Sequence, residues 1–299
     1  MNSAEVALEE KIKDGAEFQF VSGSRLYGTE NLLSDWDIRG FVIPPFEHIL
    51  GNKSFEVREF EGDHKIFSLK RFLQLALSGD PLISESFFLP DDKIMKKSAI
   101  SDEIMALKDD IISDVIYRRI VGYSRNEWRK AMGVKRVSAK RTRTEDEVIN
   151  DIRSVFGLNK EKMDLVIDTF YEDREVKEIS SLAGIGGKRK QEVEKYGYCV
   201  SSASHSIRLL DQLQELMKTG KITFPRRNAS VLKRVRSGGV SKEEAEEMHE
   251  EVLQKVEEAK KVSILPDKPN SKKVWKKYLK VISDYVISDD RFKEFCNLM

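Results

Sequence analysis

The segment at residues 20–40 reads FVSGSRLYGTENLLSDWDIRG, and it decides the expected fold. A strand signal at residues 17–21 runs into Gly23-Ser24, which has the composition of a turn. After a gap of ten residues beyond the serine, Asp35 and Asp37 open a second apolar stretch. The order of strand, Gly-Ser turn, Asp-x-Asp and strand predicts a site at the edge of a sheet.

The acidic pair has a chemical meaning if it belongs to the second strand. Side chains alternate along a strand, so Asp35 and Asp37 would project together while Trp36 and Ile38 point to the core. Two close carboxylates repel one another unless a cation neutralises them, and magnesium accepts carboxylate and phosphate oxygens. The turn at residues 22–24 would present backbone N–H groups and a hydroxyl to a phosphate. The simpler alternative is a turn followed by two solvated acids, but the compound pattern favours a nucleotide site.

Further elements follow the same stretch. Residues 54–68 read as two strands around Glu61-Gly62, and Ser68 is expected to cap a helix that ends at Gly79. Beyond Pro90 the periodic segments are helical, namely residues 111–132, 145–156, 160–171, 202–217, 242–261 and 272–287. The sequence therefore predicts an α+β protein with a small mixed-sheet domain at residues 1–95 and a mainly helical domain at residues 96–299.

Composition narrows the class of protein. The chain has 299 residues, of which 40% are hydrophobic and 34% charged, as in soluble globular proteins. No stretch approaches the roughly 18 apolar residues that span a bilayer, and residues 5–13 alternate acids and bases. We therefore expect a cytoplasmic protein without a membrane partner. Cys199 and Cys296 have no histidine neighbours at metal-ligand spacing, so neither a disulfide framework nor a zinc site is expected.

Positive charge is concentrated at residues 118–143, where ten basic residues accompany one acid, Glu127. This segment predicts binding of a polyanion, with Tyr123 and Trp128 interleaved for stacking on bases. The residues expected to contact nucleic acid are Arg118, Arg125, Arg129, Lys130, Lys135 and Arg136. The glycine-rich residues 181–190 look like the hairpin of a helix-hairpin-helix element. A solvated helix face and an ordinary loop are the alternatives for the two segments.

The pattern around residue 30 resembles the nucleotidyltransferase superfamily typified by DNA polymerase beta. In that superfamily Gly-Ser precedes Asp-x-Asp by about this gap, and a third carboxylate comes from a later strand. Glu59, Glu61 and Asp63 share strand parity, so periodicity alone leaves the third acid open. The position of Asp63 before an apolar strand makes it our choice. The resemblance implies that Asp35, Asp37 and Asp63 are catalytic and bind two magnesium ions, with manganese as a substitute.

The similarity is closest to bacterial and phage predicted nucleotidyltransferases associated with RNA-repair genes. The matching features are the Gly-Ser-x-x-Tyr-Gly-Thr run at Gly23–Thr29, Arg39-Gly40, the stretch Asp63–Leu77, Asp80-Pro81 with Glu85, Gly197-Tyr198, His205, Arg208-Leu209-Leu210 and Leu265–Pro269. The family pattern has an acid and a lysine just after Gly-Tyr, where this chain has Cys199 and Ser201. This departure removes a basic group from the start of the helix.

The resemblance implies nucleotide-binding roles for Gly23, Ser24, Arg25, Tyr27, His205 and Arg208. Arg25 and Tyr27 would otherwise cover the turn, and His205 and Arg208 would otherwise form a surface pair. The expected activity is magnesium-dependent transfer of a nucleoside monophosphate from a triphosphate such as ATP to a nucleic-acid end, preferably RNA, with release of pyrophosphate. Asp63 would lie nearest the acceptor as general base. Two alternatives stay open: transfer to a protein, and a catalytically silent nucleic-acid-binding module.

Overall fold

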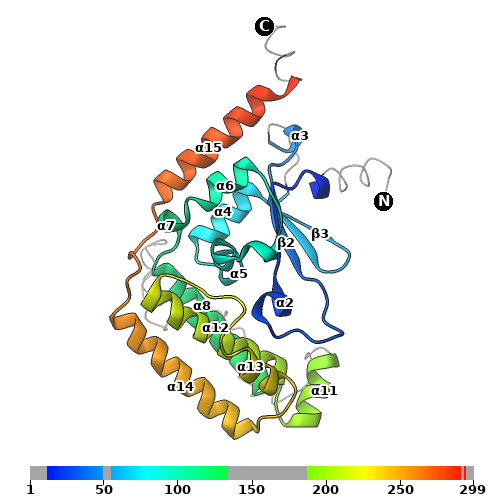
Figure 1. Cartoon of the computed structure of the whole chain (residues 1–299), viewed down its shortest axis with the longest axis vertical. Coiled ribbons are helices and arrows are strands. Elements are labelled where there is room, and N and C mark those ends of the chain that lie inside the picture. Colours follow the sequence, from blue (N-terminus) through cyan, green and yellow to red (C-terminus); the bar gives the residue numbers. More distant parts are fainter. Residues whose placement is uncertain (1–11, 50–54, 134–186, 291–292, 294–299) are drawn as a thin grey trace, which may run out of the picture.

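The computed structural model describes residues 12–49, 55–133, 187–290 and 293. Its sheet has five strands in the order β3-β4-β2-β1-β5 (Figure 1). The strands are β1 (Phe18–Val21), β2 (Ile38–Val42), β3 (Val57–Phe60), β4 (His64–Ser68) and β5 (Ile94–Lys97). Strands β2 and β4 are parallel and the other neighbours are antiparallel, which confirms the predicted mixed sheet.

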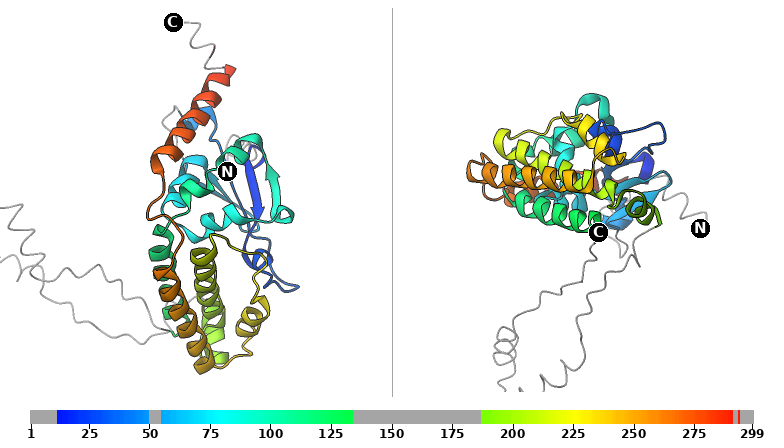
Figure 2. Two further views of the ribbon diagram at one scale, coloured as in Figure 1. Left: turned by 60° about the vertical axis from the view of Figure 1, so that its left-hand side comes forward. Right: turned by 90° about the horizontal axis from the view of Figure 1, so that it is seen from below.

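Shorter helices surround the sheet and longer ones build the rest of the chain. The helices are α2 (Gly23–Tyr27), α3 (Phe46–Ile49), α4 (Leu69–Leu77), α5 (Pro81–Glu85), α6 (Ala99–Met105), α7 (Lys108–Ile111), α8 (Val115–Ala131), α11 (Gly187–Tyr196), α12 (Val200–Thr219), α13 (Ala229–Arg236), α14 (Lys242–Lys261) and α15 (Ser271–Ser288), with 3-10 turns η1 (Ser86–Phe88) and η2 (Asp91–Lys93). Figure 2 shows α12 running among α8, α13 and α14, and these helices pack along it. The chain is therefore an α+β protein, as predicted.

The predicted helices are confirmed where the structure describes them. Helix α14 has the predicted bounds, and α12 and α15 exceed theirs by one or two residues at each end. Helix α8 begins later than residue 111 because Ile112 is extended and separates it from α7. Ser68 caps α4, since its hydroxyl accepts the backbone N–H of Arg71 at 3.2 Å. The predicted helices at residues 145–156 and 160–171 lie outside the described residues.

One expectation about the second strand is wrong. Trp36 was expected to point into the core, but its side chain is 54% exposed and β2 begins only at Ile38. The partner strand explains this, because β1 ends at Val21, directly opposite Ile38, and the last backbone hydrogen bond between the two segments runs from Ser22 to Asp37. Asp35 and Trp36 therefore lie in a loop before the strand, where the alternation of side chains does not apply.

The sheet and the long helices share one hydrophobic core. Phe41 of β2, Phe72 of α4, Ile116 of α8 and Leu213 of α12 belong to the same buried cluster. Strand β5 also extends the sheet to Lys97, beyond the boundary expected at residue 95. The division into two domains stays a prediction.

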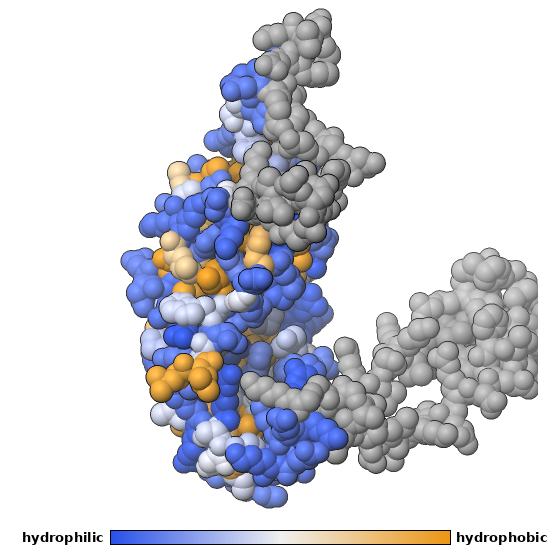
Figure 3. All heavy atoms as spheres, turned by 90° about the vertical axis from the view of Figure 1, so that its right-hand side faces the viewer, coloured by the Kyte–Doolittle hydropathy of each residue, from blue (hydrophilic) through white to orange (hydrophobic). Residues whose placement is uncertain are grey.

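Among the described residues no helix is long and apolar enough to cross a bilayer. On the face in Figure 3 apolar residues form small separate groups among hydrophilic ones.

A second buried cluster packs residues of α8, α12, α13 and α14 against one another. Within it the rings of Trp128 and His249 stack at a centroid distance of 4.0 Å and an interplanar angle of 11°. Trp128 thus stacks inside the protein, which leaves Tyr123 as the expected stacking residue that reaches the cavity described below. Burial lowers the pKa of His249 from 6.5 to about 4.

His249 should make the protein sensitive to acid. The unfolded chain binds a proton near pH 6.5 and the folded chain does not, so the free energy of unfolding should fall as pH drops toward 4, by roughly 3 kcal/mol from this residue. His249→Phe keeps a ring on Trp128 and removes that titration. Urea denaturation at about pH 7 and about pH 4.5 should show a smaller difference in unfolding free energy for the variant. An unchanged difference would mean that His249 has the same pKa in the folded and unfolded chains.

Candidate active site

The site begins at the short helix α2, which follows β1 after a single residue. Gly23 opens the helix with φ of 63°, a left-handed conformation that favours glycine. Gly28 ends the helix with φ of 75°, and a side chain there would lie 2.8 Å from Cβ of Pro225. The backbone N–H of Thr29 donates to the carbonyl of Ser24 at 2.9 Å. The Gly-Ser-x-x-Tyr-Gly-Thr run is therefore a tight one-turn helix closed at both ends.

Asp37 lies directly against this turn. A Cβ atom on Gly23 would come within 1.8 Å of Oδ2 of Asp37, so only glycine leaves room for the carboxylate. The backbone N–H of Ser22 also donates to the carbonyl of Asp37 at 2.7 Å. The Gly-Ser turn and the second aspartate thus form one packed unit.

The parallel pairing of β2 and β4 brings the third acid to the same place. Ile38 lies opposite His64, so the residues just before the two strands, Asp37 and Asp63, meet at one edge of the sheet. The side chain of Glu59 pairs instead with Lys65 at 2.9 Å. Among the acids that sequence parity left open, Asp63 is therefore the one that adjoins Asp37.

Arg39 bridges these two carboxylates. Its Nη2 lies 2.9 Å from Oδ2 of Asp63 and 3.7 Å from Oδ1 of Asp37. Burial, together with the hydrogen bond to Asp63, raises the pKa of Asp37 to about 6. The same hydrogen bond, followed by Arg39, lowers the pKa of Asp63. Two carboxyl groups in contact have one raised and one lowered pKa because their negative charges repel one another, and a bound cation reduces this repulsion.

The predicted metal-binding trio is not assembled. Asp35 is exposed and lines the cavity, and within the described ranges no three His, Cys, Asp or Glu side chains are grouped to hold a metal ion. The pair of Asp37 and Asp63 still fits magnesium chemically, because that ion is commonly held by one or two carboxylates together with substrate phosphate and water.

Arg25 supports the loop that carries Asp35. Its guanidinium donates to the carbonyls of Ser34 at 2.8 Å and Asp35 at 3.3 Å, and it stacks 4.3 Å from the ring centroid of Trp36. Of the two interpretations of Arg25, contact with nucleotide or cover for the turn, the geometry supports the second.

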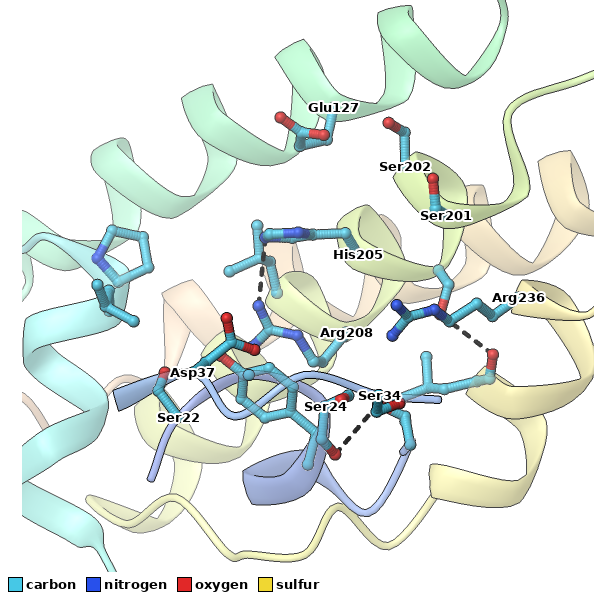
Figure 4. A pocket seen from close by; sticks show the side chains of 18 of the residues that line it. Ser22, Ser24, Ser34, Asp37, Glu127, Ser201, Ser202, His205, Arg208 and Arg236 are labelled. Carbon is cyan, nitrogen blue, oxygen red and sulfur yellow. Dashed lines mark hydrogen bonds between the residues drawn. The ribbon is translucent and has the colours of Figure 1, made fainter. Parts of the chain in front are cut away.

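A cavity of about 780 Å³ opens beside Asp37, between the turn and the helices (Figure 4). Its lining includes Ser22, Gly23, Ser24, Asp35 and Asp37 on one wall, and Tyr123, Glu127, Arg189, Ser201, Ser202, His205, Arg208 and Arg236 on the other. Figure 4 shows the side chains of Ser24 and Asp37 facing those of helix α12 across this space. Residues far apart in the chain, from Ser22 to Arg236, thus enclose one site.

A buried network joins the two walls. The hydroxyl of Tyr27 donates to Oε2 of Glu85 at 2.8 Å, and Nη1 of Arg208 donates to Oε1 of the same carboxylate at 2.8 Å. The guanidinium also lies 3.7 Å from the ring centroid of Tyr27. Glu85 and Arg208 are 3% and 5% exposed. Tyr27 and Arg208 therefore line the cavity with their polar groups already engaged, and the charge of Arg208 is neutralised within the protein.

His205 is neutral in this setting. Burial and then Arg208 lower its pKa to about 3. Its Nε2 lies 3.2 Å from Nη2 of Arg208, and a guanidinium can only donate, so Nε2 accepts. The proton of the neutral ring is then on Nδ1. His205 and Arg208 do face the cavity together, as their helical spacing suggested.

The helix that departs from the family pattern is tied to its neighbour. Glu192 of α11 accepts hydrogen bonds from the backbone N–H and hydroxyl of Ser201 at 3.0 and 2.8 Å, and from the thiol of Cys199 at 3.1 Å. Ser201 lines the cavity at the start of α12. Cys199 and Ser201, which replace the acid and the lysine of the family pattern, thus bind the carboxylate of Glu192 at the start of α12.

The basic segment is only partly described. Arg118, Arg125 and Arg129 are exposed on α8, and Lys130 is paired with Glu127 at 2.6 Å. Lys135 and Arg136 lie outside the described residues, as do residues 181–186 of the expected hairpin. The remainder of that motif, residues 187–190, is helical. Sequence reasoning missed Arg236 because the Lys-Arg-Val-Arg run at the end of α13 has the pattern of an ordinary solvated helix.

Comparison with known proteins agrees with this architecture. The model of the RNA repair pathway DNA polymerase beta family matches residues 6–272. The chain is also 25% identical, over 294 aligned residues that cover 79% of it and 87% of the relative, to an uncharacterised 38.9 kDa protein of the nrdC-mobD intergenic region of Enterobacteria phage T4. No solved structure matches. Because the family model covers most of the sequence, the strand-turn-strand site included, the chain belongs to the RNA repair pathway DNA polymerase beta family.

Proposed function

We propose that the protein is a nucleotidyltransferase that transfers a nucleoside monophosphate from a triphosphate such as ATP to the end of an RNA strand and releases pyrophosphate. Its membership of a polymerase beta-like family supports nucleotidyl transfer, and the family's link to RNA repair supports an RNA acceptor. The observation that carries the proposal is the contact of Asp37 with Gly23, which places a carboxylate on a Gly-Ser turn inside a cavity large enough for a nucleotide.

The residues on the Gly-Ser side of the cavity have different roles in this proposal. Ser24 and the backbone beside Gly23 hold donor phosphates, because a hydroxyl and glycine-lined N–H groups suit an anion. Asp37 and Asp63 hold magnesium, with Asp35 as the third proposed ligand because it lines the same cavity. When bound, the metal would neutralise phosphate charge and favour departure of pyrophosphate. Asp63, kept ionised by its neighbours, accepts the hydrogen bond of an acceptor hydroxyl.

Asp37→Asn should abolish transfer while the protein stays folded, because the substitution removes a metal-binding charge and relieves repulsion with Asp63. The test incubates the protein with magnesium and each α-labelled nucleoside triphosphate, supplying RNA, single-stranded DNA or protein extract in turn. Label should appear on RNA and disappear with the variant. Asp92→Asn is a matched control, since that side chain is 71% exposed and not part of the cavity lining.

The same assay separates the competing functions. Label on protein, lost in Asp37→Asn, would replace RNA by a protein acceptor. Label that persists in Asp37→Asn would refute the site. RNA binding without any transfer, insensitive to magnesium and to Asp37, would favour a silent binding module on the α8 surface.

A further inference from the structure

The cavity carries opposite charges at its two ends. Asp37 lies at one end, against the Gly-Ser turn. In Figure 4 the side chain of Arg236 projects from α13 on the far side of Ser24 from Asp37, with Ser34 beneath it. Arg189 of α11 lines the same cavity. The space thus runs from a carboxylate, past a serine, to the guanidinium group of Arg236, and Arg189 lines it as well.

Neither arginine has an ion-pair partner among the described residues. Other cations of these helices have partners: Arg208 pairs with Glu85, Lys130 with Glu127 and Arg234 with Glu244. Within the part of the chain that the structure describes, neither Arg189 nor Arg236 pairs with a carboxylate. Arg189 and Arg236 therefore add positive charge to the cavity lining that no described carboxylate pairs with.

The nearby side chain of His205 is also affected by these positive charges. After burial and Arg208, the causes that lower the pKa of His205 include Lys130, Arg236 and Arg189. The start of α12 does not supply this field alone, because Glu192 already accepts the backbone N–H of Ser201. The guanidinium groups of Arg189 and Arg236, unpaired among the described residues, are thus donors that an anionic ligand in the cavity can contact.

We propose that Arg236 and Arg189 bind the terminal phosphate of the donor triphosphate. This inference rests on the proposed function, because the α-phosphate must then lie beside Asp37 and the chain of phosphates must extend away from it. Ser24 lies along that path and Arg236 lies beyond it. Guanidinium groups bind phosphate through paired hydrogen bonds, so the site selects triphosphates over diphosphates and monophosphates.

The test compares binding rather than turnover. Isothermal titration with magnesium measures the affinity of the wild-type chain, Arg236→Ala and Arg189→Ala for AMP, ADP and an ATP analogue with a methylene group between the α and β phosphates. Each variant should lose about tenfold or more in affinity for the triphosphate, since a charge-assisted hydrogen bond is lost, and nothing for AMP. Arg234→Ala is the matched control on the same helix, because its partner is Glu244 at the surface.

Three results would overturn the proposal in distinguishable ways. Equal losses for all three nucleotides, or none, with thermal unfolding unchanged, would refute the terminal-phosphate site and leave the proposed function standing. Weaker binding of single-stranded RNA with unchanged binding of the triphosphate would assign the arginines to the acceptor instead. A wild-type chain that binds none of the nucleotides would refute the donor and this subsite together.

Discussion

Gly23→Ala is expected to lower the rate of nucleotidyl transfer by at least about 100-fold. The added Cβ would lie 1.8 Å from Oδ2 of Asp37, so the carboxylate must move by more than 1 Å, and displacements of that size cost about this much in rate. The rate should be measured in a single turnover with saturating labelled triphosphate. Folding is followed by thermal unfolding of the same samples.

A second glycine separates the two consequences of this substitution. Gly133 also has a positive φ, of 71°, but nothing lies within 4 Å of a Cβ placed there. Gly133→Ala therefore carries a similar backbone cost of about 1–2 kcal/mol at a residue that does not line the cavity. It should lose stability and keep its activity at permissive temperature. A Gly23→Ala protein that is as active as Gly133→Ala would show that Asp37 does not act from the position described.

Arg208→Met is expected to lower the free energy of unfolding by about 3–5 kcal/mol. The substitution leaves the buried carboxylate of Glu85 with the hydroxyl of Tyr27 as its remaining hydrogen-bond partner among the described residues. Chemical denaturation at neutral pH measures the loss. Because Glu85 and Tyr27 connect α5 and α2 to α12, the variant should also bind nucleotide more weakly.

The double variant tests the cause. Glu85→Gln combined with Arg208→Met removes both charges, so it should be more stable than Arg208→Met alone. Lys255→Met is the surface control, since its pair with Glu251 is exposed and should contribute less than about 1 kcal/mol. If Arg208→Met cost no more than Lys255→Met, the network would not hold the two walls together.

Local chemistry made part of the site predictable. The strand before Gly23, the glycine turn and the acid pair are consecutive in sequence, and the bounds of α14 follow from a run whose apolar spacing and Ser241 cap agree. Asp35 and Trp36 were misplaced because strand alternation was extended beyond the last paired residue, Ile38.

Long-range pairing was not readable from the sequence. Parity alone left Asp63 open among three acids, and only the parallel register of β2 with β4 selects it by position. The same holds for Glu85 and Arg208, which meet through tertiary packing although they lie far apart in the chain. Arg236 gave no signal, because its role depends on which cavity α13 borders.

The enclosure of one cavity by residues from Ser22 to Arg236 also has a consequence in time. Protein synthesis proceeds at roughly 5–20 residues per second, so about 10–40 s separate the making of the first wall from that of the last. During this interval a nascent chain carries the acidic pair and its glycine turn without the arginines of the far wall. Under the proposed function, a growing chain on the ribosome should therefore transfer no nucleotide until α13 has emerged and docked.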